Sequence, residues 1–97
     1  MDELKKKIVE IIKRQLNLPH YKVFLFGSQA NKKADERSDL DIGIEASSPL
    51  PPHVLAKIRE ELDQLPVIQK IDLVDFNLVS SDFKEVALQS IEVLYEK

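Results

Sequence analysis

The sequence predicts an α/β fold in which one small mixed sheet is backed by helices. Segments with helical periodicity alternate along the chain with short runs of strand-forming residues, an order typical of sheets covered by helices. The 97 residues contain no internal repeat, no low-complexity tract and no linker that would separate two domains. With 43% hydrophobic and 32% charged residues, the composition is that of a folded globular domain. We therefore expect a single domain over residues 1–97.

The first half of the chain predicts one helix and two strands. Apolar residues recur at helical spacing near the amino end, at Leu4, Ile8, Ile11, Ile12 and Leu16. Asn17 and Pro19 end this helix, and the apolar run at residues 23–26 is typical of a strand buried on both faces. A short helix is expected at residues 28–33, and apolar and polar residues then alternate strictly over residues 39–45. This alternation predicts a second strand with two different faces.

The second half predicts a helix, a strand and a last helix. The proline-rich loop at residues 47–52 precedes a helix whose buried stripe comprises Leu55, Ile58, Leu62 and Leu65. Residues 67–76 are rich in strand-forming side chains and predict the third strand. Asp82 and Glu85 have the spacing of a helix-capping box. The apolar stripe of the last helix would then comprise Phe83, Val86, Ala87, Ile91 and Leu94.

Composition and charge exclude several classes of protein. A formal net charge of −3 argues against tight, sequence-indifferent binding to nucleic acid. The absence of cysteine excludes a disulfide framework and a cysteine zinc site, and fits a reducing compartment. The amino end reads as an amphipathic helix, so we expect neither a signal peptide nor a membrane span, and place the protein in the cytoplasm. Because so small a domain buries only roughly two-thirds of its unfolded surface, we expect a homo- or hetero-oligomer.

Two acidic residues define the first candidate site. Asp39 and Asp41 lie two apart on a predicted strand, so both carboxylates project from one face, and Gly43 would leave space on that face. Like charges on one sheet face repel each other, and the usual compensation is a divalent cation such as Mg²⁺, which prefers oxygen ligands. The alternative is an edge strand whose solvent-facing side is acidic.

The Gly27-Ser28 pair defines a second candidate site, where a buried strand turns into the start of a helix. Glycine lets a phosphate approach the backbone, and a serine hydroxyl with free helix N–H groups can hold the phosphate oxygens. The Gly-Lys-Ser/Thr ending of a P-loop is missing. The alternative is an ordinary turn glycine followed by a helix cap.

The chain contains a spaced motif, in which Gly27-Ser28 is followed by ten residues and then by Asp39-Leu40-Asp41. This motif lies in a strand–turn–strand context. In this motif, and in length and element order, the chain resembles the minimal nucleotidyltransferase (MNT) branch of the DNA polymerase β-like superfamily. The resemblance covers almost the whole chain. It implies the nucleotidyltransferase fold and transfer of a nucleoside monophosphate, AMP from ATP, to an acceptor hydroxyl with release of pyrophosphate.

The resemblance also implies the roles of individual residues. A third carboxylate is expected on a later strand; Asp72 fits that role, whereas Asp75 points to the other face and is expected to be solvent-facing. Asp39, Asp41 and Asp72 would bind Mg²⁺, with Asp72 also a candidate to accept the hydroxyl proton. Gly27, Ser28 and Lys32 would bind the nucleotide phosphates.

One departure from the family pattern concerns phosphate binding. Relatives often carry a basic residue and then a glycine shortly after the Gly-Ser pair, where this chain has Asn31 and Lys32. Lys32 or Lys33 could replace the lost charge.

The acceptor is expected to lie on another protein, because so short a chain has no room for an acceptor-binding domain. The resemblance implies a partner, a HEPN-domain ribonuclease toxin, with the MNT protein acting as antitoxin by transferring AMP to a toxin tyrosine. The alternative is a non-catalytic module of the same fold that neutralises its partner by binding. Transfer to a small molecule such as an aminoglycoside would need an acceptor pocket, for which we expect the chain to be too short, and a nucleic-acid acceptor is disfavoured by the acidic balance.

Overall fold

The computed structural model describes residues 2–27 and 39–97. Along the described chain the elements are α1 (Asp2–Gln15), β1 (Tyr21–Phe26), β2 (Leu40–Ala46), α2 (Pro52–Asp63), β3 (Ile71–Asp75), α3 (Ser81–Ala87) and β4 (Glu92–Glu96). The short helix expected at residues 28–33 lies outside the described residues. None of the described helices is long and apolar enough to span a membrane.

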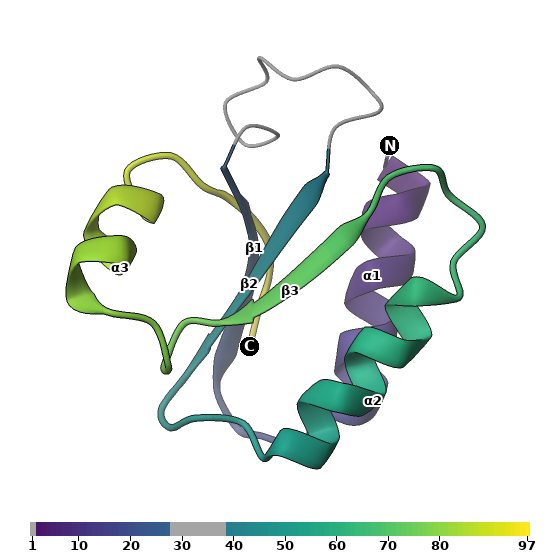
Figure 1. Cartoon of the computed structure of the whole chain (residues 1–97). Helices are drawn as coiled ribbons and strands as arrows, with labels where there is room; N and C mark the ends of the chain where they lie inside the picture. Colours follow the sequence, from purple (N-terminus) through teal and green to yellow (C-terminus); the bar gives the residue numbers. More distant parts are fainter. Residues whose placement is uncertain (1, 28–38) are drawn as a thin grey trace.

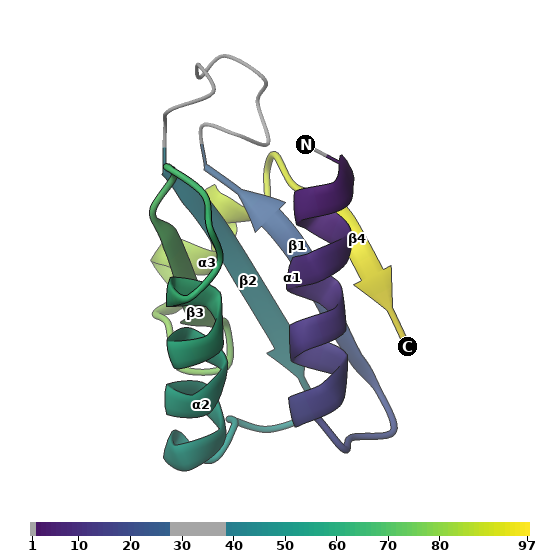
Figure 2. The same cartoon turned by 90° about the vertical axis from the view of Figure 1, so that its right-hand side faces the viewer.

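The strands form a four-stranded sheet in the order β3-β2-β1-β4. β1 pairs antiparallel with both β2 and β4, whereas β2 and β3 are parallel. The predicted α/β class with a small mixed sheet is therefore confirmed. Helices α1 and α2 cover one face of this sheet, and α3 lies on the opposite side (Figures 1 and 2).

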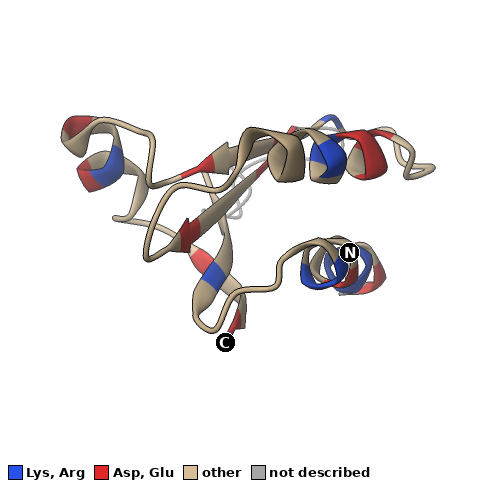
Figure 3. Cartoon of the chain, turned by 90° about the horizontal axis from the view of Figure 1, so that it is seen from below, with Lys and Arg blue, Asp and Glu red and all other residues tan. Residues whose placement is uncertain are grey.

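An aliphatic core fills the space between the sheet and helices α1 and α2. Most of the predicted stripe residues of both helices are buried there against alternate residues of the strands, including Leu40, Ile42 and Ile44 of β2. Leu4 and Leu65 are only partly buried, and Leu65 lies beyond the end of α2. Each of the three helices also carries residues of both charge signs (Figure 3). Helices α1 and α2 are therefore amphipathic layers that pack on one face of the sheet.

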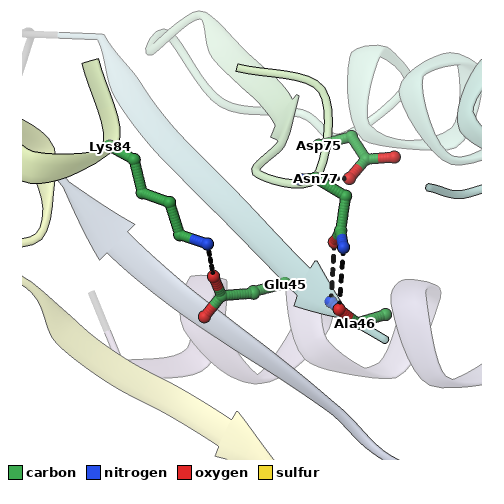
Figure 4. A network of polar contacts seen from close by, with 5 residues as sticks. All are labelled: Glu45, Ala46, Asp75, Asn77 and Lys84. Atoms are coloured by element: carbon green, nitrogen blue, oxygen red, sulfur yellow. Dashed lines mark hydrogen bonds and ion pairs between the residues drawn. The ribbon is translucent and has the colours of Figure 1, made fainter. Parts of the chain in front are cut away.

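The opposite face of the sheet carries a smaller aromatic core. Phe24, Phe26 and Phe76 are buried there, and the Phe24 and Phe76 rings meet edge to face with centroids 4.8 Å apart. An ion pair between Lys84 of α3 and Glu45 of β2 helps to hold α3 over this face (Figure 4). The candidate site lies on the same face of the sheet, beyond the aromatic rings.

The predicted last helix is wrong in its second half. The helix ends at Ala87, and Glu92–Glu96 forms strand β4 instead. The apolar positions at Ile91 and Leu94 fit a helical period, but pairing along the free edge of β1 supplies backbone hydrogen bonds that a longer α3 would forgo. Tertiary pairing thus overrides the local periodicity.

Two boundaries also differ from the prediction. The third strand is shorter than expected and comprises Ile71–Asp75. Helix α3 is capped by Ser80, whose Oγ accepts a hydrogen bond of 3.1 Å from the Phe83 backbone N–H. The predicted capping box of Asp82 and Glu85 is therefore wrong, because both residues lie inside the helix.

Candidate active site

Strands β2 and β3 bring two of the predicted acidic residues together. Asp41 and Asp72 are register partners on these parallel strands, so their side chains leave the same face of the sheet next to each other. Both are half-buried, whereas Asp39, just before β2, is exposed. The pairing follows from strand alternation, which directs Leu40 and Ile42 into the aliphatic core and Asp41 to the other face.

The turn after β1 lies directly against this acid pair. Phe26, the last residue of β1, is the register partner of Asp41. Gly27 follows with a φ of +76°, a conformation that side-chain-bearing residues rarely adopt. A Cβ added to Gly27 would lie only 2.6 Å from Asp41 Oδ2. The backbone turn can approach the carboxylate this closely because residue 27 is glycine.

The predicted phosphate-binding residues are only partly described by the structure. Gly27 lies beside the acid pair as expected from the motif. Ser28 and Lys32 lie outside the described residues, as do Asn31 and Lys33. Their phosphate-binding roles therefore stay predictions.

The space expected above Gly43 is filled. A Cβ on this residue would meet Phe24 Cε2 at 2.5 Å and Phe76 Cε1 at 2.7 Å. The space above Gly43 is therefore occupied by two aromatic rings and is not open to a ligand. The expectation was wrong because Phe76 follows β3 and packs across the sheet, a contact that the β2 sequence cannot reveal.

The electrostatic environment of Asp41 is unfavourable for its charge. Burial raises the pKa of the Asp41 carboxyl, and the neighbouring carboxylates of Asp72 and then Asp39 raise this pKa further. A divalent cation at this position would relieve the repulsion, and carboxylate oxygens are suitable ligands for Mg²⁺. The chemistry of these donors therefore fits a hard metal ion.

The ligand set is not fully assembled by the described residues alone. Within residues 2–27 and 39–97, no three acidic or histidine side chains are gathered closely enough to hold a metal ion. Asp41 and Asp72 form the nucleus of a site, and Asp39 acts on Asp41 through its charge. Further ligands would have to come from a movement of Asp39, from the nucleotide or from water.

A cavity of about 560 Å³ opens in front of the acid pair. Arg59 and Lys70 also line it, and they place positive charge near Asp41 and Asp72. Lys70 Nζ lies 3.8 Å from Asp72 Oδ1, and Arg59 Nη2 donates a hydrogen bond of 2.9 Å to the Leu73 carbonyl at the edge of β3. This volume is typical of small-molecule sites.

Arg59, Lys70 and Phe83 also line this cavity but are not among the site residues predicted from the sequence. A signal existed for Lys70, which precedes Asp72 by two positions and so shares its side of the chain. No sequence signal pointed to Arg59, because it reaches the site from α2 around the edge of the sheet.

Asp75 is not the solvent-facing acid that was expected. It is only 4% exposed, and its carboxylate accepts hydrogen bonds from the backbone N–H groups of Leu50 at 2.8 Å and Asn77 at 2.9 Å. The Asn77 side chain in turn donates to the Ala46 carbonyl and accepts from the Ala46 N–H (Figure 4). Asp75 thus stabilises the region where β2 and β3 end, and it takes no part in the acid cluster.

Several solved structures share the fold of this chain. A chain from the complex of tri-AMPylated Shewanella oneidensis HEPN toxin with MNT antitoxin matches with a TM-score of 0.74 and 20% identity, covering 98% of this chain and 72% of that chain. A chain from a toxin–antitoxin crystal structure with AMP-PNP matches with a TM-score of 0.77 and 21% identity, covering 94% and 72%.

Sequence comparison identifies the family. The family model described as polymerase beta, nucleotidyltransferase, matches residues 6–97. The probable protein adenylyltransferase MntA of Haemophilus influenzae is 34% identical over 90 residues, which cover 93% of this chain and 78% of that protein. The chain therefore belongs to the polymerase β nucleotidyltransferase family, and the resemblance found in the sequence is confirmed.

Proposed function

We propose that this protein is an adenylyltransferase that transfers AMP from ATP to a tyrosine hydroxyl of a partner HEPN ribonuclease toxin and so acts as an antitoxin. The observation that carries the proposal is the pairing of Asp41 with Asp72 beside the Gly27 turn. The homologous protein named as a protein adenylyltransferase, and the complex of a tri-AMPylated HEPN toxin with an MNT antitoxin, support this choice of reaction and partner.

Asp39, Asp41 and Asp72 would hold one or two Mg²⁺ ions. When bound, the metal would neutralise charge on the α-phosphate and align the attacking and leaving oxygens. The acceptor oxygen forms a bond to the α-phosphorus, the bond to the β-phosphate oxygen breaks, and pyrophosphate leaves. Asp72, at the edge strand, is the candidate to take the hydroxyl proton.

Gly27, Ser28 and Lys32 would hold the phosphates of the nucleotide. Gly27 supports this role through its close approach to Asp41, which leaves its backbone beside the acid pair.

We further propose that residues 1–97 act as a single domain and that the reaction takes place in the cytoplasm. The absence of cysteine supports this compartment, because the chain needs no disulfide bond and therefore no oxidising environment.

A second candidate function is neutralisation by binding without catalysis. One observation favours it: the described residues do not gather three metal-ligating side chains. In this case the partner toxin would be blocked by contact, and the acid pair would contribute nothing to its inhibition.

The decisive experiment is incubation of the purified protein with α-labelled ATP and Mg²⁺, with and without the partner toxin. We expect label on the toxin, loss of this label in the Asp39→Asn variant, and retention of the label in a Glu85→Gln control. Glu85 suits the control because it is an exposed acid on α3. A stable complex that shows no label transfer would refute the catalytic proposal in favour of the binding function.

A further inference from the structure

The cavity in front of Asp41 and Asp72 extends past the edge of the sheet on the side of β3. Strand β3, which carries Asp72, is the end strand of the sheet next to β2. Three charged side chains line the cavity on this side, namely Arg59 and Asp63 of α2 and Lys70 just before β3. We call this side the outer side of the cavity.

The guanidinium of Arg59 is fixed at this edge by the backbone of β3. The Lys70 carbonyl accepts a hydrogen bond of 2.8 Å from the Leu40 N–H. Because the direction of backbone groups alternates along a strand, residues at even positions of β3 face β2 and residues at odd positions face the free edge. The Leu73 carbonyl therefore points to the free edge, where Arg59 Nη2 donates a hydrogen bond of 2.9 Å to it. This bond holds a positive charge on the outer side of the cavity.

The outer side carries more positive than negative charge. The side chain of Lys70 is 73% exposed, and its Nζ lies 3.8 Å from Asp72 Oδ1. An exposed ion pair of this kind is weak, so the ammonium group can turn to another anion. Apart from the acid pair, Asp63 is the one acid among the described residues that line the cavity. An anionic group that enters past β3 therefore meets two cations, Arg59 and Lys70.

The chemistry of the proposed reaction decides which substrate approaches from the outer side. An in-line displacement places the attacking and leaving oxygens on opposite sides of the α-phosphorus. The leaving phosphates are proposed to lie beside the Gly27 turn, which follows β1. Since the strand order is β3-β2-β1, the attacking oxygen then comes from the side of β3, near Asp72. Arg59 and Lys70 therefore flank the acceptor and lie away from the leaving pyrophosphate.

We propose that Arg59 and Lys70 form a subsite for an anionic group that the acceptor chain carries close to its reacting hydroxyl. This assignment rests on the proposed function, because in-line transfer is what directs the acceptor to the outer side. A guanidinium has five N–H donors in a planar fork that matches carboxylate and phosphate oxygens alike, so the bond to Leu73 leaves donors for a ligand. The anionic group has two chemical sources: an acidic side chain beside the tyrosine, or the phosphodiester of an AMP attached earlier.

The test separates acceptor binding from catalysis and from nucleotide binding. Initial rates of AMP transfer at saturating ATP and low salt, measured over a range of toxin concentrations, give kcat and the KM for the partner toxin. Isothermal titration in Mg²⁺ gives the dissociation constant of ATP. Lys70→Gln is the main probe, because Arg59→Gln also removes a hydrogen bond to the backbone of β3. Lys57→Gln is the matched control, since Lys57 is an exposed cation of α2 that is not among the described residues lining the cavity.

We expect Lys70→Gln and Arg59→Gln each to raise the KM for the toxin by about threefold to fivefold, the size expected for one exposed charge pair. The kcat and the dissociation constant of ATP should stay at the parent values. Lys70→Arg should keep the parent KM because it keeps the positive charge, and Lys57→Gln should behave as the parent protein does.

Two forms of the toxin identify the source of the negative charge. One is the unmodified toxin, and the other is toxin that already carries one AMP, on which a ribose hydroxyl is the acceptor. A raised KM for the unmodified toxin assigns the subsite to an acidic side chain of the toxin. A raised KM for the AMP-carrying toxin alone assigns it to the phosphodiester, and mass spectrometry should then show the singly modified toxin accumulating with Lys70→Gln.

Three results would overturn the inference and leave the proposed function intact. A parent-like KM of both variants for both forms of the toxin would mean that the two cations bind no acceptor group. Weaker ATP binding by the variants would assign the cations to the nucleotide, and a lower kcat at unchanged KM would mean that Lys70 acts only through Asp72. Absence of label transfer by the parent protein would instead refute the proposed function, and the inference would fall with it.

Discussion

Asp72 and Asp75 are the same residue type on the same short strand, yet the two sides of the sheet give them opposite environments. Asp72 is half-buried beside Asp41 and forms an ion pair with the exposed Lys70. Asp75 is buried among backbone donors on the side of α2. Among the described residues, Asp72 has one exposed ion pair, whereas the Asp75 carboxylate accepts two backbone hydrogen bonds. Strand alternation separates them, and the neighbouring segments decide which contributes to stability and which is available for chemistry.

The first prediction concerns Asp72 and has the largest expected effect. Asp72→Asn should lower AMP transfer by at least about 100-fold, because stabilisation by a correctly held metal is worth several kcal/mol. The same substitution should change the free energy of unfolding by less than about 0.5 kcal/mol, since an exposed ion pair such as that with Lys70 contributes little. Label transfer and urea denaturation measure the two quantities. Parent-like activity would remove Asp72 from the proposed site.

The second prediction concerns Asp75, where we expect a loss of stability. Asp75→Ala should lower the free energy of unfolding by about 3 kcal/mol, because it removes two charge-assisted hydrogen bonds and leaves the N–H groups of Leu50 and Asn77 without this acceptor. Urea denaturation gives the value directly. Asp72→Ala is the matched control and should fall near the parent protein. Equal destabilisation by the two alanines would contradict the contrast between the two faces.

The third prediction tests how tightly the aromatic core is packed behind the acid pair. Gly43→Ala should destabilise the fold by about 1–3 kcal/mol, because the added methyl group would overlap the rings of Phe24 and Phe76. Both rings are almost fully buried and have little room to move. The measurement is thermal unfolding, with Ala46→Gly as a small-residue comparison elsewhere on β2. An unchanged transition temperature would show that the rings can move aside.

Much of the fold, and the placement of Gly27 beside Asp41, could be predicted from local sequence patterns. Strict alternation located β2 and directed Asp41 away from the core, and the spacing from Gly27 placed the turn beside the acid pair. These features depend on residues close in sequence or on the pairing of two adjacent strands. Asp72 was predicted from the family resemblance, which implies a third carboxylate on a later strand, and strand alternation favoured it over Asp75.

The errors arose where distant segments meet. The environment of Asp75 depends on the Leu50 N–H, 25 residues away, and the space at Gly43 is closed by a ring that follows β3. The residues around Leu94 have a helical period but form a strand, because the edge of β1 offers them backbone partners. Arg59 and Phe83 reach the cavity from two different helices, which no local pattern encodes.

The fourth prediction has the smallest expected effect and tests the electrostatic repulsion around Asp41. The pKa of Asp41 is raised above its unfolded value of 3.8 by burial and by Asp72 and Asp39. The folded state therefore binds this proton more tightly than the unfolded state, and stability falls as the pH rises from the unfolded pKa through the folded pKa. Asp41→Asn removes this penalty and should stabilise the protein at pH 7 by about 0.5 kcal/mol, after discounting for solvent screening.

This gain should shrink as the pH is lowered toward 4, because the parent carboxyl is then increasingly neutral and resembles the amide. Thermal unfolding between pH 4 and pH 7 measures it, and about 0.5 kcal/mol corresponds to roughly 2–4 °C for a domain of this size. Added Mg²⁺ should stabilise the parent protein more than the variant, since the ion binds the folded acid pair. A parent protein more stable than Asp41→Asn at pH 7 without metal would mean that attractive groups, rather than the repulsion of Asp72 and Asp39, dominate around Asp41.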